Sequence, residues 1–387
     1  MPLITARRIH DGQKWLPAGT VIEVADNGTI IALHNNVTSD VTHYEGVLAP
    51  GFVNVHCHLE LSHMKGVVPE HTSLIPFLQS IPKYRNDFSA EQKKEARHNA
   101  YNELYNNGVV AVGDIANVPD TLDVRAQDKL HVHTFVEAIG FAERPDKQFE
   151  RSVEVYDTFA AQQPGAKHVR QSIVPHAPYS VSYSLFSMID RHGKQSLISI
   201  HNQESRAEDE YYLLKTGAVQ TLLHGIGIDD SFFQPSGKTS LQTYLEWLSP
   251  THPFIFVHNT YTSLADLQLA MAYLPNVYWC LCPNANLYIE NTLPDIDMLT
   301  KHHAKLCVGT DSLASNHQLS VLAELHTIKQ RYKDIDWETL LSWGTYNGAC
   351  ALQMDDILGS FQPGKQPGIV QLKGLDSNTV PTVQRIL

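Results

Sequence analysis

The stretch Gly51-Phe-Val-Asn-Val-His-Cys-His58 joins a buried-strand pattern to two side chains that bind metals well. Its short apolar run is typical of a strand that is covered on both faces, as in a parallel sheet. His56 and His58 are two positions apart at the end of the run, so both imidazoles lie on one face of the strand. The stretch therefore predicts a buried strand that ends in a polar pair.

Seven more apolar runs follow the first, and polar loops and helical patterns separate them. They begin near Val109, His131, Val169, Leu197, Phe254, Val277 and Leu306. Helical spacing of apolar residues predicts helices over 183–192, 263–274, 319–332 and 337–352, and a start signal at Ser89 with a stop near Gly108 predicts the first helix, over 89–108. That first helix begins with a capping box, Ser89-Ala-Glu-Gln92. Eight strands that alternate with helices predict the α/β class and a TIM-like (β/α)₈ barrel over residues 49–358.

Both ends of the chain have a different pattern. Residues 1–48 contain β-rich runs, two of which flank Asn27-Gly28, a strong hairpin signal. Residues 359–387 are also β-rich, and we expect the two ends to form one small unit beside the barrel.

One connection is unusually long. About 50 residues separate the fifth and sixth runs, and they include an insertion at 217–250. Long insertions after barrel strands often shape a substrate pocket. A peripheral decoration is an equally good interpretation from the sequence alone.

Composition excludes several classes of partner. The 387 residues include 29 basic and 41 acidic side chains, for a net charge of −12. Nucleic acid and anionic membranes need basic surfaces, so we expect a small-molecule substrate, although a local basic pocket for an anionic group stays open. No secretory signal or membrane-length apolar stretch is present, and the five dispersed cysteines favour a reducing compartment, which we expect to be the cytoplasm. A homo-oligomer also stays open.

The chain has 21 histidines, and their position relative to the strands separates them. In a barrel of this kind the chemistry lies where strands end. The polar residues at or just after strand ends are His56, His58, His176, His201, Glu204, His258 and Asp311. Unconnected burial of such groups is costly, whereas a shared metal ion would explain them.

Three imidazoles and a carboxylate form a complete set of metal ligands. His56, His58, His201 and Asp311 would hold one divalent ion and leave a position for water. Such an ion lowers the pKa of its water toward about 7. Glu204 and His258 are then available for proton transfer and polarisation.

Other candidate ligands have simpler explanations. His131-Val-His133 has ligand spacing but begins its strand, which places it at the opposite, structural face. His302 and His303 precede the eighth strand, where solvated surface is the better interpretation. Cys280 and Cys282 lie in an apolar run without a second cysteine pair, so we expect them in the core.

The strand-end motifs resemble those of the amidohydrolase superfamily, in its deaminase and chlorohydrolase branch. The matching pieces are Ala49-Pro-Gly-Phe-Val-Asn-Val-His-Cys-His58, His176-Ala-Pro-Tyr-Ser180, His201-Asn-Gln-Glu204, Val257-His258, Cys282-Pro-Asn-Ala-Asn286 and Gly309-Thr-Asp-Ser-Leu-Ala-Ser-Asn316. Each piece is weak alone, but together and in family order they are specific. The resemblance implies that 1–48 and 359–387 form a composite β-sandwich. The family often has an aspartate near the C-terminus, where this chain reads Gly364-Lys-Gln-Pro-Gly-Ile-Val370.

The resemblance also implies residue roles. One zinc ion, or sometimes iron, would lie on His56, His58, His201 and Asp311. The fourth strand has no lysine, which favours one metal rather than two. By the same comparison His258 would position the water and Glu204 would protonate a ring nitrogen. Asp311 would pass a proton to the leaving amine, and His176 would contact substrate.

The resemblance implies hydrolytic deamination of a purine-like ring with release of ammonia. The stretch His58-Leu-Glu-Leu-Ser62 is similar to the corresponding sequence in enzymes that deaminate aminodeoxyfutalosine in menaquinone biosynthesis. Glu60, in this stretch, is either a substrate contact or an exposed loop residue. The alternative is a hydrolase of a cyclic amide, a urea or an aryl halide. Retirement of the scaffold to a binding role is disfavoured, because no expected ligand is missing.

Overall fold

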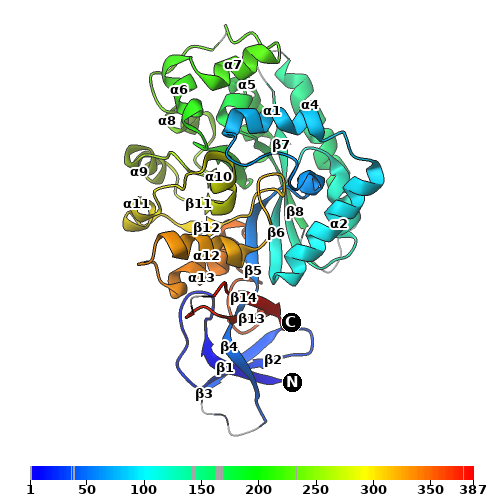
Figure 1. Cartoon of the computed structure of the whole chain (residues 1–387), viewed down its shortest axis with the longest axis vertical. Helices are drawn as coiled ribbons and strands as arrows, with labels where there is room; N and C mark the ends of the chain where they lie inside the picture. The colour runs from blue at the N-terminus through cyan, green and yellow to red at the C-terminus, as the bar shows by residue number, and fades with distance from the viewer. Residues whose placement is uncertain are drawn as a thin grey trace.

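All eight apolar runs form strands, and helices cover them (Figure 1). The computed structural model describes the chain except for residues 1, 36, 38, 39, 141–143, 162–166, 168, 232 and 378. The eight strands are β5 (Phe52–Cys57), β6 (Val109–Ala116), β7 (His131–Ala138), β8 (Val169–Pro175), β9 (Ile198–Asn202), β10 (Phe254–His258), β11 (Val277–Leu281) and β12 (Leu306–Val308).

These strands form two four-stranded parallel sheets, ordered β5-β6-β7-β8 and β12-β11-β10-β9. Backbone hydrogen bonds join the sheets at both edges. The amide of His201 donates to the carbonyl of His176 over 3.0 Å, and the amide of Thr310 donates to the carbonyl of His56 over 3.0 Å. Gly309 permits the second approach, since a Cβ there would lie 2.9 Å from the backbone nitrogen of His56. The carboxyl ends of all eight strands therefore face one side.

The helices agree with the predicted pattern, with one exception. They are α1 (Leu74–Tyr84), α2 (Ala90–Asn106), α3 (Leu122–Arg125), α4 (Pro145–Ala160), α5 (Tyr183–His192), α6 (Arg206–Leu214), α7 (Ala218–Gly225), α8 (Ser240–Tyr244), α9 (Leu264–Tyr273), α10 (Pro283–Glu290), α11 (Ile296–Lys301), α12 (Val321–Arg331), α13 (Trp337–Gly344) and α14 (Tyr346–Ala351). Four short 3₁₀ turns are η1 (Leu59–Met64), η2 (Pro119–Thr121), η3 (Pro178–Ser180) and η4 (Leu245–Trp247). The predicted capping box of α2 is confirmed: Ser89 accepts from the Gln92 amide, and the Gln92 side chain accepts from the Ser89 amide.

The predicted helix over 337–352 is wrong as a single element. It breaks at Thr345, whose φ of −126° and ψ of −87° are not helical. The Thr345 hydroxyl donates to the carbonyl of Leu341 and approaches that of Gly12 over 3.3 Å. A tertiary contact to the N-terminal segment therefore accompanies the break.

Strands from both chain ends form one six-stranded sheet at one end of the molecule (Figure 1). Its order is β14 (Thr382–Arg385), β13 (Ile369–Lys373), β4 (Thr42–Pro50), β1 (Leu3–Ile9), β2 (Thr20–Val24) and β3 (Ile30–Asn35). The hairpin predicted at Asn27-Gly28 is confirmed, because β2 and β3 pair antiparallel around Gly28, whose φ is +85°. β4 leads directly into β5, so this sheet adjoins the helix-covered strands.

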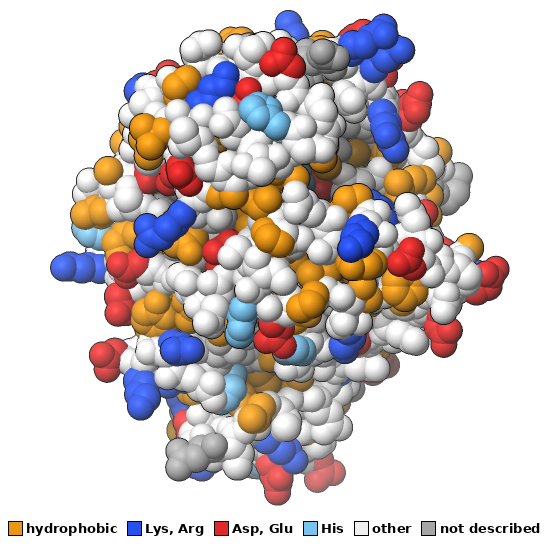
Figure 2. Space-filling view, turned by 45° about the horizontal axis from the view of Figure 1, so that its top comes forward, with side chains coloured by type: hydrophobic (Ala, Val, Ile, Leu, Met, Phe, Trp, Pro, Cys, Tyr) orange, Lys and Arg blue, Asp and Glu red, His pale blue; other side chains and the backbone are white. Residues whose placement is uncertain are grey.

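The long connection between β9 and β10 contains α6, α7, α8 and η4. On the face shown in Figure 2, basic side chains are scattered among acidic ones. Within the described residues, no helix is both long enough and apolar enough to cross a membrane.

Candidate active site

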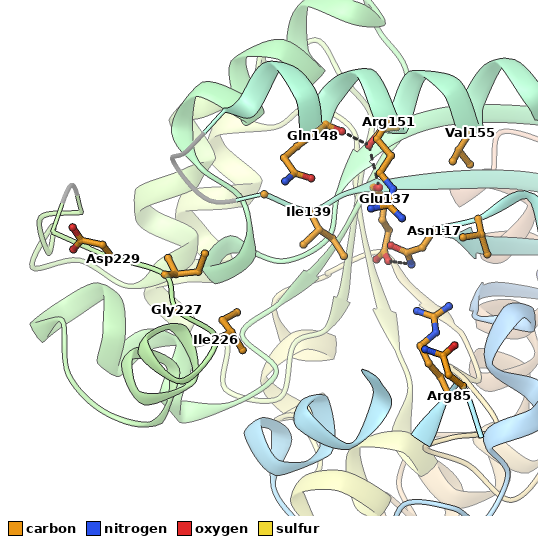
Figure 3. A pocket seen from close by; sticks show the side chains of 15 residues that line it. Arg85, Asn117, Glu137, Ile139, Gln148, Arg151, Val155, Ile226, Gly227 and Asp229 are labelled. Carbon is orange, nitrogen blue, oxygen red and sulfur yellow. Dashed lines mark hydrogen bonds between the residues drawn. The ribbon is translucent and has the colours of Figure 1, made fainter. Parts of the chain in front are cut away.

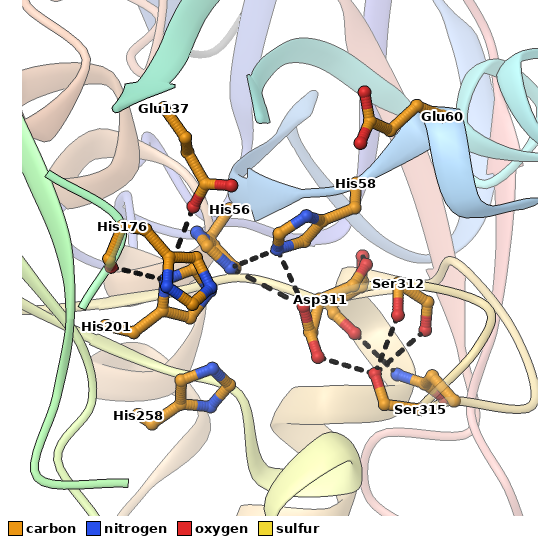
Figure 4. A network of polar contacts seen from close by, with 12 residues as sticks. His56, His58, Glu60, Glu137, His176, His201, His258, Asp311, Ser312 and Ser315 are labelled. Atoms are coloured by element: carbon orange, nitrogen blue, oxygen red, sulfur yellow. Dashed lines mark hydrogen bonds and ion pairs between the residues drawn. The ribbon is translucent and has the colours of Figure 1, made fainter. Parts of the chain in front are cut away.

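Four strand ends bring the predicted polar residues into one cluster (Figure 4). His56 lies in β5, with His58 directly after it, and His201 lies in β9. His258 ends β10, and Asp311 follows β12. The Asp311 carboxylate is 3.2 Å from Nε2 of His58 and 3.5 Å from Nε2 of His56. Residues more than 250 positions apart in the sequence therefore meet at this one point.

Two groups of side chains have ligand geometry, and they share His201. In the first, His56, His201, His258 and Asp311 each offer an atom within 4.8 Å of the others, and in the second Glu137, His176 and His201 do so. His58 is outside both groups, but its Nε2 is only 3.2 Å from Nε2 of His56. The cluster thus contains every ligand predicted from the sequence, with His258 as an additional neighbour.

The protonation states fit a cation. Burial lowers the pKa of His56, His201 and His258 and brings that of His58 to about 3, so the imidazoles are neutral. Burial works to raise the pKa of Asp311, but the neighbouring imidazoles outweigh it and hold that pKa well below its usual range. Neutral imidazoles beside an ionised carboxylate are the forms that bind metal ions.

Crowded acceptors support the same conclusion. Nε2 of His56, Nε2 of His58 and the Asp311 carboxylate converge within 3.5 Å, although few protons are available there. A divalent cation among these atoms would satisfy them together. The residues present therefore fit a metal ion.

Neighbouring groups orient the cluster. Nδ1 of His201 lies 2.8 Å from the carbonyl of His176, which leaves its Nε2 for the cluster. The hydroxyl of Ser315 donates to the Asp311 carboxylate over 2.5 Å. His258 and Asp311 have φ values of +72° and +56°, a left-handed conformation that non-glycine residues rarely adopt. Such strain is typical of functional sites.

Glu204 lies beside this cluster, with its carboxylate 3.6 Å from Nε2 of His258. Burial raises the pKa of Glu204 well above its usual range, which favours the protonated form of the side chain. A buried carboxylic acid next to a reaction centre is a good proton donor.

The two residues expected to contact substrate both line a cavity above the cluster. His176 has its ring 4.8 Å from that of His201, and its Nδ1 is 2.7 Å from the Ser180 hydroxyl. Glu60 is only 3% exposed, so the alternative of an exposed loop glutamate is wrong. Its carboxylate accepts from the amides of Asn117 and Val118 over 2.9 and 3.3 Å. Glu60 therefore clamps the loop after β6.

The sequence reasoning missed Glu137 and Asn117. Glu137 is near the end of β7, and its carboxylate lies 3.5 Å from Nδ1 of His201. Burial raises its pKa to about 8. The amide side chain of Asn117 donates to both Glu60 and Glu137. An acidic residue near the end of an apolar run was the signal that could have identified Glu137.

The histidine pair His131-Val-His133 is elsewhere. His131 is the first residue of β7, at the opposite end from the cluster. His133 stacks on Phe135 at 4.4 Å and lies 3.1 Å from the Ser172 hydroxyl. Neither belongs to a ligand group among the described residues.

The cavity above the cluster has a volume of about 530 Å³ and mostly apolar walls. These walls include Phe77 from α1 and Leu222 and Leu223 from α7, so the insertion contributes to the cavity. A second cavity of about 640 Å³ adjoins it and shares Arg85, Asn117 and Glu137 (Figure 3). Arg85 and Arg151 are the basic side chains that line the two cavities within the described part of the chain. These two arginines give the cavities the local basic character that the acidic net charge of the chain does not exclude.

Comparisons with known proteins agree with this geometry. The sequence profile of the amidohydrolase family matches residues 47–385. An aminodeoxyfutalosine deaminase from Nitratiruptor is 27% identical over 72% of this chain. The match spans 66% of that protein, just under two thirds of its length.

Solved structures share the fold. The aminofutalosine deaminase of Helicobacter pylori, in complex with methylthio-coformycin, superposes with a TM-score of 0.81 and 22% identity, over 98% of this chain and 94% of that one. An adenosine deaminase of Xanthomonas campestris with bound zinc has a TM-score of 0.74 and 22% identity, over 98% and 86% of the two chains.

Proposed function

The chain belongs to the amidohydrolase family, and from this premise we propose that it is a metal-dependent deaminase. It would replace the exocyclic amine of a purine-like ring with oxygen and release ammonia. The observation that carries the proposal is the buried cluster of histidines and Asp311 beside Glu204, whose pKa burial raises. That set supplies metal ligands and a proton donor on one cavity floor.

We propose His56, His58, His201 and Asp311 as the ligands of one divalent ion, with zinc preferred and iron second. The ion would supply a water of lowered pKa. Zinc is named for the adenosine deaminase from Xanthomonas campestris that shares the fold, which supports this preference.

The other side chains have roles that follow from their positions. Glu204 would give its proton to a ring nitrogen, which makes the adjacent carbon more electrophilic. His258, 3.6 Å from the Glu204 carboxylate, would orient the attacking water. Asp311 would take one proton from that water and deliver it to the amine, which leaves as ammonia. The second water proton would return to Glu204 as the ring carbonyl forms. His176 would contact the substrate at the cavity wall.

The substrate we propose is a nucleoside with a 6-aminopurine ring rather than a free base. The second cavity adds about 640 Å³ beyond the inner one, which is room for a sugar and a substituent. Aminodeoxyfutalosine is the sharpest candidate, because the deaminases of Nitratiruptor and Helicobacter pylori that carry this or a closely related name are similar to this chain.

We extend the inference to the architecture. The two four-stranded sheets, bonded at both edges, would form a closed (β/α)₈ barrel over 49–358. The six-stranded sheet of the chain ends would be the composite β-sandwich of 1–48 and 359–387.

A release assay tests the proposed function. The zinc-loaded protein is offered a panel of aminopurine nucleosides, including aminodeoxyfutalosine, and of cyclic amides and aryl halides, and ammonia and the ring product are measured. We expect ammonia from nucleosides and no product from the other compounds. Products from cyclic amides or aryl halides alone would replace the proposal with the hydrolase alternative.

A matched pair of variants tests the proton donor. Glu204→Gln should lower turnover at least about 100-fold while retaining the metal, since it cannot donate a carboxylic proton. Glu210→Gln, on the exposed side of the following helix, should behave as the wild type. A Glu204→Gln variant with normal turnover would remove Glu204 from the mechanism.

A further inference from the structure

Gln203 stands between the proposed ligand His201 and the proposed proton donor Glu204. It is fully buried, and its φ of +45° is in the left-handed region. This conformation carries a cost for a residue with a Cβ, so the surrounding contacts must hold it.

Three carboxylates bind Gln203. Its side-chain amide donates to Asp209 over 3.1 Å and to Asp266 over 3.1 Å, and its backbone amide donates to Glu208 over 3.0 Å. Its carbonyl accepts from the amide of Tyr261 over 3.0 Å. These partners come from α6, α9 and the loop after β10, so Gln203 links three parts of the chain.

The insertion is tied to the same carboxylates. The amide of Ser240, the first residue of α8, donates to Asp209 over 2.8 Å. The hydroxyl of Thr239 and the side-chain amide of Gln242 both donate to Asp266 over 2.7 Å. The N-terminal turn of α8 thus braces the acids that hold Gln203.

Glu204 itself has little to hold it. Among the described residues its carboxyl makes no hydrogen bond, and its ion-pair neighbour is His258 at 3.6 Å. The direction of its side chain therefore depends on the backbone of residues 203–205. Gln203 and the N-cap hydroxyl of Ser205, which accepts from Ala207, determine that backbone.

A space-filling role explains Gln203 less well. Its Oε1 is buried without a partner, which is unfavourable for a polar atom. An apolar residue would fill the space without an unpaired oxygen. The clamp on Asp209 and Asp266 is what the glutamine adds.

We infer that Gln203 is a positioning residue: its clamp to Asp209 and Asp266 aims Glu204 at the substrate, and the α8 turn of the insertion braces it. The catalytic part of this inference rests on the proposed function. The mechanical part, that the clamp holds residues 203–205, does not.

Gln203→Met tests the clamp, because it keeps the size and removes the amide. We expect turnover to fall about 10- to 100-fold, with the KM within threefold and the metal content unchanged, since small misplacements of a catalytic group cost that much. Gln203→Asn is a second variant that keeps a left-handed preference but is too short to span both acids. The control is Gln371→Met, a buried glutamine in β13 that donates to the carbonyl of Glu45. It should leave activity unchanged.

A double-variant cycle separates positioning from general damage. If Gln203 acts through Glu204, Gln203→Met should not slow the residual turnover of Glu204→Gln any further. If Gln203→Met slows Glu204→Gln by the same factor as it slows the wild type, the inference is overturned. Normal turnover in both Gln203 variants would overturn it as well.

Hydrogen exchange tests the mechanical part without any substrate. Backbone amides in a peptide covering residues 198–207 should exchange at least tenfold faster in Gln203→Met than in wild type or Gln371→Met. Unchanged exchange would overturn the clamp even if the enzyme is active. If no ammonia is released by the wild type, the proposed function fails, and the exchange result still decides the clamp.

Discussion

Burial has opposite effects on the two kinds of titratable side chain in the site. It lowers the pKa of the cluster histidines and so keeps them neutral, with lone pairs free for a cation. The same burial raises the pKa of Glu204 and so favours its protonated form. One buried environment therefore suits both the proposed ligands and the proposed acid.

At the scale of single residues, His131 tests the proposed assignment of the metal ligands. His131→Ala should leave the metal content near one equivalent, because His131 begins β7 at the end remote from the cluster. His56→Ala should lose the ion. Metal analysis of both purified variants is the measurement. Loss of the ion from His131→Ala would reverse the choice between the two histidine pairs.

Position along the strands made the cluster predictable from the sequence. His56, His201 and His258 could be selected because strand ends of a parallel α/β fold converge. The role of Glu60 could not be predicted from the sequence, because its hydrogen-bond partners Asn117 and Val118 lie 57 and 58 residues away. A periodic pattern reports which face a side chain is on, but not which loop will cover it.

His10 provides a residue-scale prediction of pH dependence, far from the cluster. Its Nε2 lies 3.1 Å from the carbonyl of Glu338, and its Nδ1 accepts from the amide of Gly12. Burial lowers the pKa of His10 to about 4. The unfolded chain therefore binds more protons between pH 4 and about 6.5, so stability falls as the pH drops through that window.

The variant His10→Gln should lose the part of the pH dependence of stability that comes from His10. Its free energy of unfolding, measured by denaturant titration, should approach that of the wild type as the pH falls from 7 to 5, by at most about 1.4 kcal/mol per pH unit. The control is Gln13→Asn, an exposed substitution that changes no titratable group, and its difference from wild type should stay constant. A constant difference for His10→Gln would show that His10 is not held neutral.

At the scale of elements, local signals predicted helix starts better than helix breaks. The capping box at Ser89 and Gln92 is contained within four residues, so the start of α2 was readable. The break at Thr345 coincides with a contact to the carbonyl of Gly12, 333 residues away. Spacing of apolar residues around 337–352 continues through the break and does not report it.

Helix α7 decides between the two interpretations of the insertion. Leu222 and Leu223 in α7 and Ile226 just after it line the inner cavity, so the insertion lies at the pocket. Leu222→Ala and Ile226→Ala should each raise the KM for the nucleoside substrate about fivefold with little change in kcat, because each removes apolar contact.

Steady-state kinetics with Leu214→Ala as control checks this prediction. Leu214 is on α6, is 66% exposed and lines neither cavity, so its variant should match the wild type. An unchanged KM in both Leu222→Ala and Ile226→Ala would restore the view that the insertion is peripheral.

At the scale of the whole molecule, the cluster lies where the two sheets meet. His56 comes from β5 at the edge of one sheet, His201 comes from β9 at the edge of the other, and Asp311 follows β12. An ion on these side chains would cross-link both sheet edges. Since an ion that binds only the folded chain stabilises it by mass action, metal loading and global stability must change together.

For the whole molecule we predict that removal of the ion by a chelator lowers the Tm. At a free zinc concentration about 100 times its Kd, binding contributes about 2.7 kcal/mol, which for a chain of this size corresponds to a Tm shift of roughly 3 °C. Thermal unfolding of the zinc-loaded protein, before and after treatment with a chelator, measures this shift. Asp311→Asn should unfold at the same temperature with and without chelator, because it lacks the charged ligand that joins β12 to β5. A wild type whose Tm does not respond to chelation would show that the cluster holds no structural cross-link, and the ligand assignment would then have to rest on metal analysis alone.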